Sequence, residues 1–212
     1  FVILAFDISE EYDTPVIIRM TTRVSHSQSI VEICKPQGQK IKEYKKDIPK
    51  YVMMPAMAKA RHIIVEDRMN RLADDSNNMS INEVETNDRS VGIITSGISY
   101  QYVKEVLPNA SILKLGMVYP FPDRLIREFA STVDRLYVVE ELEPFIEEHV
   151  KSMGIETASD NLFSIQGELS GNTIYSKITG KQPNVKSAAN VPGRPPVLCP
   201  GCPHRSVYYM IK

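Results

Sequence analysis

Two cysteines near the end of the sequence have the residue type and spacing for metal or redox chemistry. Cys199 and Cys202 are separated by two residues and are followed by His204. Two thiolates at this spacing reach one metal ion or one face of an iron-sulfur cluster. Cys34 and His204 are the other candidate ligands, whereas zinc or a [4Fe-4S] cluster takes four. The residues leave three interpretations open: an inert or structural pair, half of a metal site completed elsewhere, or a dithiol redox pair.

A second polar run lies near the start of the sequence. The apolar residues Val16 to Met20 predict a strand, and residues 21–27 after it carry hydroxyls together with Arg23 and His26. Hydroxyl, guanidinium and imidazole groups at a strand end bind an anionic substrate or a neighbouring domain. They also suit the start of a helix, here over Gln28 to Ile33, and capping is the preferred interpretation.

Five glutamates gather between residues 140 and 148, which raises the question of paired carboxylates for acid-base catalysis. They are Glu140, Glu141, Glu143, Glu147 and Glu148. Acids at a helix start interact favourably with the helix dipole, and the others suit a solvated helix face. The structural interpretation is therefore preferred.

The elements that must position these side chains are organised around residues 91–153. Apolar runs at 91–95, 110–115 and 136–139 alternate with segments of helical periodicity. This alternation predicts a three-layer α/β/α fold with a mostly parallel open sheet, and residues 81–86 predict an edge strand. Ligands on such sheets lie beyond the carboxyl ends of the strands. The sequence has no glycine-rich phosphate-binding motif there, so ordinary turns are the preferred interpretation.

The remaining sequence predicts helices joined by polar segments. Helical patterns cover residues 1–12, 51–75 and 172–178, and a further helix begins near residue 203. A proline-rich stretch over residues 180–203 predicts an extended linker. The first and last residues lie inside apolar patterns, so the sequence is expected to be a section of a longer polypeptide.

Charge and composition exclude several classes of partner. The 25 Lys and Arg residues balance 26 Asp and Glu residues, which gives no field that would attract nucleic acid or an anionic membrane. The sequence shows neither a transmembrane run nor a signal peptide. Its three cysteines predict a reducing, cytoplasmic location rather than a disulfide framework.

Several motifs, in order along nearly the whole sequence, together resemble the α subunit of indolepyruvate:ferredoxin oxidoreductase. The most specific is the run that contains both cysteines. The motifs are Thr22 to Ser27, Ser96 to Tyr100, Lys114 to Met117 with Tyr119 and Pro120, Val138 to Glu148, and Arg194 to Arg205.

The resemblance implies a thiamine-diphosphate enzyme that oxidatively decarboxylates aryl pyruvates to aryl acetyl-CoA and passes electrons to ferredoxin. It implies Mg²⁺, [4Fe-4S] clusters and CoA in the full enzyme, a β subunit as partner and an α2β2 assembly. The domain boundaries that it implies are 1–34 for the end of a pyrimidine-binding domain, 35–50 for a linker, 51–180 for a domain like the transketolase C-terminal domain, 181–193 for a second linker, and 194–212 for the start of a diphosphate-binding domain.

The same resemblance assigns roles to individual residues. It implies metal ligation by Cys199 and Cys202, cofactor binding by Gly201 and His204, and a place for Arg23 and His26 at a domain or active-site junction. The family's catalytic carboxylate and magnesium-binding region have no counterpart here, so no catalytic residue is predicted in this chain. The chain is expected to act mainly as scaffold and domain interface; a stand-alone interaction module and a CoA-binding domain without catalysis are the alternatives.

Overall fold

The structure is a computed structural model that describes residues 1–33, 38, 43–184, 197–198 and 201–211. The chain divides into two compact units, Phe1–Gln182 and Pro183–Lys212. The first unit contains the α/β sheet with its helices and the helices that precede it, and the described residues of the second contain one helix, α9 (His204–Ile211). Each unit is described by itself.

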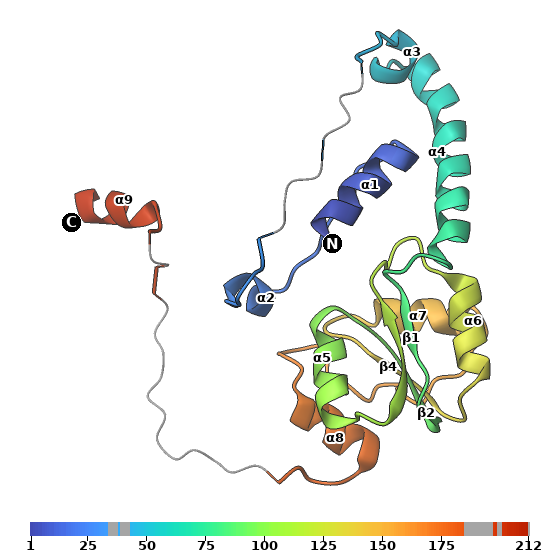
Figure 1. Cartoon of the computed structure of the whole chain (residues 1–212), viewed down its shortest axis with the longest axis vertical. Coiled ribbons are helices and arrows are strands. Elements are labelled where there is room, and N and C mark those ends of the chain that lie inside the picture. The colour runs from blue at the N-terminus through green and yellow to red at the C-terminus, as the bar shows by residue number, and fades with distance from the viewer. Residues whose placement is uncertain (34–37, 39–42, 185–196, 199–200, 212) are drawn as a thin grey trace. The chain divides into compact units, whose positions relative to one another are not determined.

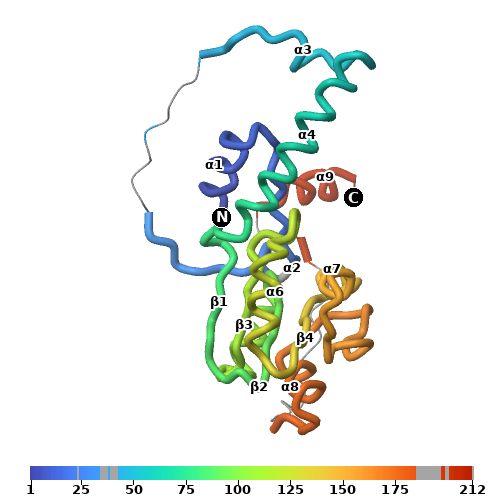
Figure 2. The backbone as a smooth tube through the Cα atoms, turned by 90° about the vertical axis from the view of Figure 1, so that its right-hand side faces the viewer, coloured from blue at the N-terminus to red at the C-terminus, as the bar shows by residue number. Residues whose placement is uncertain are grey.

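The described residues of the first unit form a four-stranded sheet in the order β1-β3-β2-β4. Its strands are β1 (Glu83–Glu85), β2 (Asp88–Ser96), β3 (Ala110–Leu115) and β4 (Leu136–Val139). The central strand β2 pairs in parallel with β3 and β4, while β1 pairs antiparallel with β3 at the edge. Figure 2 shows β1 outside β3. The predicted parallel sheet with an edge strand is confirmed.

Neighbouring residues along each strand point to opposite faces of the sheet, and both faces are buried. Ile94, Leu113 and Val138 contribute to the core under α6 (Asp123–Ser131) and α7 (Phe145–Ser152). Ile93, Ile112 and Tyr137 contribute to the core under α5 (Gly97–Val106) and α8 (Gly171–Thr179). Figure 1 shows these two helix pairs on opposite sides of the sheet. The predicted three-layer α/β/α architecture is therefore confirmed.

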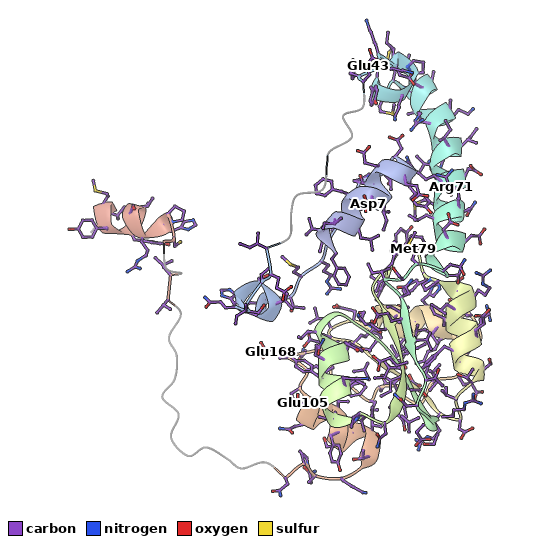
Figure 3. All side chains as sticks on the ribbon, in the orientation of Figure 1. Asp7, Glu43, Arg71, Met79, Glu105 and Glu168 are labelled. Carbon is purple, nitrogen blue, oxygen red and sulfur yellow. The ribbon has the colours of Figure 1, made fainter. Side chains whose placement is uncertain are left out.

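Within the ranges that the structure describes, four helices precede the sheet: α1 (Val2–Tyr12), α2 (Thr22–His26), α3 (Ile48–Tyr51) and α4 (Pro55–Ser76). The end of α1 is attached to the end of α4 by a small apolar cluster of Ile8, Tyr12 and Leu72. The Tyr12 hydroxyl donates a 2.6 Å hydrogen bond to Asp75. Figure 3 labels Arg71 on the side of α4 that faces α1, where its guanidinium lies 5.1 Å from the Tyr12 ring centre.

Asp13 strengthens this attachment where α1 ends. It adopts the left-handed conformation, with φ of 51°. Its carboxylate forms a 2.7 Å ion pair with Lys50 and lies 3.6 Å from Arg61 and 3.9 Å from Arg68. The Lys50 hydrogen bond lowers the pKa of Asp13. Cations near a helix C-terminus are stabilising, so α1 ends in a site that holds α3 and α4 against it.

Three expectations about this first part of the chain are wrong. Residues 16–20 are not a strand, because no other described strand pairs with them, and Ile17 is 91% exposed. The helix expected over 28–33 is absent from that described stretch, and the cap at Thr21 begins α2 at residue 22 instead. The long helix expected over 51–75 begins only at Pro55, because proline is favoured in a helix's first turn and restricts the residue before it.

The described part of the chain contains no helix that is both long enough and apolar enough to cross a membrane.

Candidate functional site

The structure brings two of the predicted site residues of the second unit into contact. The Cys202 Sγ atom lies 3.2 Å from Nδ1 of His204. The carbonyl of Cys202 accepts a 3.1 Å hydrogen bond from the backbone N–H of Arg205, which forms a turn at the start of α9. Gly201, with φ of 75°, supplies the left-handed residue just before the cysteine. The short turn therefore presents a thiol and an imidazole together.

Cys199, the other cysteine of the motif, lies outside the described residues, as does Cys34. Within the described ranges, no three His, Cys, Asp or Glu side chains gather closely enough to hold a metal ion. Cys202 and His204 have the atom types that zinc and iron-sulfur centres use, but two ligands do not complete either site. The described residues therefore do not form a metal site by themselves.

The predicted junction residues Arg23 and His26 both belong to the five-residue helix α2. Thr21 caps this helix, and Ser27 donates a 2.8 Å hydrogen bond to the carbonyl of Val24. The hydroxyls thus stabilise α2 itself, whereas the helix over residues 28–33 that they were expected to cap is absent. His26 is exposed, and the side chain of Arg23 lies outside the description.

Glu140 follows β4 directly and holds the start of α7. Its two carboxylate oxygens accept hydrogen bonds of 2.9 Å from the backbone N–H groups of Ile146 and Glu147. Burial raises the pKa of Glu140, and the two N–H donors oppose that shift. The carboxylate satisfies two N–H groups that have no partner within the helix, so the structural interpretation holds for Glu140.

Two further glutamates of the acidic cluster hold loops. Glu141 accepts a 3.1 Å hydrogen bond from the backbone N–H of Leu169, and Glu147 accepts 2.8 Å bonds from the hydroxyls of Thr157 and Ser159. Glu147 is 8% exposed, which differs from the solvated face expected for it. Its two hydroxyl partners and Lys151 compensate for its burial.

The end of β3 is held by an asparagine that the sequence analysis did not single out. The buried Asn82 accepts 3.0 Å hydrogen bonds from the N–H groups of Gly116 and Met117 and donates a 2.9 Å bond to the carbonyl of Ser76. Gly116 leaves no room for a side chain, because a Cβ atom would lie 2.3 Å from the Ile81 carbonyl oxygen. Asn82 therefore joins the end of α4 to the carboxyl end of β3.

Comparison with curated proteins gives a consistent result. The chain is 34% identical to the indolepyruvate oxidoreductase subunit IorA of Archaeoglobus fulgidus, over an alignment that includes 99% of the chain. It is 36% identical to the subunit of that name in Methanothermobacter thermautotrophicus and 34% identical to that of Pyrococcus horikoshii, with 98% of the chain aligned in each case. The resemblance to indolepyruvate oxidoreductase subunits is confirmed. All three relatives are named as subunits of an oxidoreductase.

The match covers only part of each IorA subunit. The chain spans 37% of the length of the curated relatives. Among solved structures, a 2-oxoglutarate:ferredoxin oxidoreductase from Magnetococcus marinus with 2-oxoglutarate, coenzyme A and succinyl-CoA bound matches 60% of this chain and 24% of its own chain, at 19% identity and a TM-score of 0.46. No family model matches the chain.

Proposed function

We propose that this chain is a section of the α subunit of a 2-oxoacid:ferredoxin oxidoreductase that acts on aryl pyruvates such as indolepyruvate. The supporting observation is identity of 34 to 36% to IorA subunits over 98 to 99% of the chain. In the proposed reaction, an aryl pyruvate is decarboxylated and oxidised to the aryl acetyl-CoA, and two electrons pass to ferredoxin. The proposed partners are a β subunit and ferredoxin in an α2β2 assembly.

The α/β domain acts mainly as scaffold and domain interface in this proposal. The carboxylates at the ends of its strands are engaged in the fold: Glu140 holds α7, and Glu141 holds the loop at Leu169. These contacts support structural roles for both carboxylates. Residues 1–34 are the proposed end of a preceding domain, 51–180 the scaffold domain, and 194–212 the beginning of the next.

The proposed cofactor contacts lie in the turn before α9. Cys199 and Cys202 would hold one side of a [4Fe-4S] cluster, and Gly201 and His204 would contribute to cofactor binding. The 3.2 Å distance between Cys202 Sγ and His204 Nδ1 supports this proposal, because it brings two candidate site residues close together. When bound, thiamine diphosphate supplies the electron sink that decarboxylation of a 2-oxo acid needs. Arg23 and His26 are proposed to lie at the junction with the preceding domain.

The test uses the full-length protein, coexpressed with its β subunit and purified without oxygen. Reduction of ferredoxin or a viologen dye is followed after addition of indolepyruvate and CoA. We expect reduction that depends on both compounds, loss of reduction in Cys202→Ser, and retained reduction in Cys34→Ser. A folded assembly that reduces neither acceptor with any aryl pyruvate would contradict the proposal and leave the interaction module as the better account.

A further inference from the structure

Helix α3, the turn after it and the first half of α4 expose large apolar side chains. The exposed fraction runs from 43% for Val52 to 72% for Ile63. We call these residues the α3–α4 surface: Tyr51, Val52, Met53, Met54, Ile63 and Ile64. Large exposed apolar side chains that gather on neighbouring elements are unusual on a soluble domain and mark an interaction site.

A hollow of about 390 Å³ lies beside this surface and shares Ile64 with it. Met57, Ala60 and Ile64 line it from successive turns of α4, and Pro49 lines it from α3. Lys50 and Arg61 also border the hollow, but both lie in ion-pair contact with Asp13. Asp47 is the one acidic residue of the lining, and the other residues are apolar, so the hollow suits an apolar side chain rather than an anion.

Helix α4 has few packing contacts along its first half, which also indicates that another segment covers it. This helix has 22 residues, yet Leu72 and Ser76 near its end are its buried residues. A helix in a protein gains most of its stability from tertiary packing, and the first half of α4 has no buried residue in the described structure. Methionine and aromatic residues are enriched at interfaces, and the flexible side chains of Met53, Met54 and Met57 adapt to the shape of a partner.

We infer that the α3–α4 surface is the docking face for a part of the same polypeptide that lies outside these 212 residues. The curated relatives carry 63% of their length beyond the match, since the match covers 37%. A tethered segment competes at an effective concentration of about a millimolar, far above that of a second copy or a separate subunit. The inference uses the proposed function only for the length of the intact polypeptide.

Methionine oxidation in the full-length α subunit tests this inference. The protein is treated with dilute hydrogen peroxide in its native state and again when unfolded, and the rates at Met53, Met54 and Met57 are measured by mass spectrometry. Docking within the polypeptide predicts native rates that are slower than unfolded rates on the order of tenfold or more, because covered thioethers are shielded from the oxidant. Equal native and unfolded rates at these three methionines would overturn the inference.

Two further arms identify the occupant of the surface. Protection should be the same at two subunit concentrations tenfold apart and the same with or without the β subunit. Protection that rises with concentration would indicate a second copy, and protection that needs the β subunit would indicate that partner; either result overturns the inference. These readouts do not depend on turnover, so an inactive protein with covered methionines would contradict the proposed function alone.

A charge placed in the hollow gives the matched test by mutation. Ile64→Asp should speed the oxidation of Met53, Met54 and Met57 toward the unfolded rates, because the buried carboxylate opposes docking. Gln101→Asp places the same side chain on an exposed position of α5 and should retain the wild-type rates. Unchanged protection in Ile64→Asp would contradict the inference. If that variant does not fold, the ratio of unfolded to native oxidation rates in the wild-type protein still decides the inference.

Discussion

Replacing Glu140 tests whether the carboxylate at the end of β4 serves the fold. Glu140→Ala removes both oxygens and leaves the N–H groups of Ile146 and Glu147 without their 2.9 Å acceptors. An unsatisfied buried donor costs about 1 to 3 kcal/mol, and this site is only partly buried, so we expect a loss of about 2 to 4 kcal/mol for the pair.

Glu140→Gln separates the hydrogen bonds from the charge. Burial raises the pKa of Glu140, so the folded state does not favour the ionised form. Folding stability should therefore fall as pH rises from 4.5, the ordinary pKa of the carboxyl group, through its higher pKa in the folded state. Glutamine keeps one acceptor oxygen and no charge, so one of the two N–H groups loses its acceptor. We therefore expect a loss of about 1 to 2 kcal/mol, smaller than that of Glu140→Ala, and a stability without this pH dependence.

Urea unfolding followed by circular dichroism measures these differences. Glu148→Ala is the matched control, because Glu148 belongs to the first turn of α7 and is exposed. Its loss should not exceed about 1 kcal/mol, the usual contribution of an acid near a helix start. The structural account of Glu140 would be refuted if Glu140→Ala were as stable as Glu148→Ala.

Three other substitutions test separate parts of the fold by the same unfolding measurement. Glu85→Gln should lose about 0.5 to 1 kcal/mol at neutral pH. The Lys104 hydrogen bond lowers the pKa of Glu85, so the deficit should disappear as pH falls below 4.5 through the folded pKa; a deficit that persists in acid would contradict this. Gly116→Ala should lose about 1 to 3 kcal/mol, because the new Cβ would lie 2.3 Å from the Ile81 carbonyl oxygen, and wild-type stability would exclude that clash. Tyr12→Phe should lose about 1 kcal/mol with its 2.6 Å hydrogen bond to α4, and should speed proteolysis within residues 1–33; unchanged proteolysis would show that this bond does not hold α1.

The sheet could be predicted because its strands are buried on both faces. Such strands are continuous apolar runs, as at 91–95 and 136–139, and each run ends in turn residues. The run at 16–20 has the same composition, but a strand also needs a partner, and the composition of one segment does not report on partners. That is why the strands predicted from the local pattern were correct in the sheet and wrong near the start of the chain.

The candidate site could be predicted only in part. The spacing of Cys199 and Cys202 was enough to single out this motif. Cys202 and His204 are also close in sequence, so their contact could be expected. The role of Asn82 depends on contacts with residues 116 and 117, more than 30 positions away, so no local signal indicates it. Further ligands of the proposed cluster could not be predicted from this sequence, because the chain spans 37% of the length of its relatives.

The cofactor content of the full-length α subunit tests the central claim most directly. Protein purified without oxygen should contain thiamine diphosphate and iron with acid-labile sulfide, and Cys202→Ser should lose iron while Cys34→Ser retains it. A folded full-length protein that contains neither thiamine diphosphate nor iron would contradict the account.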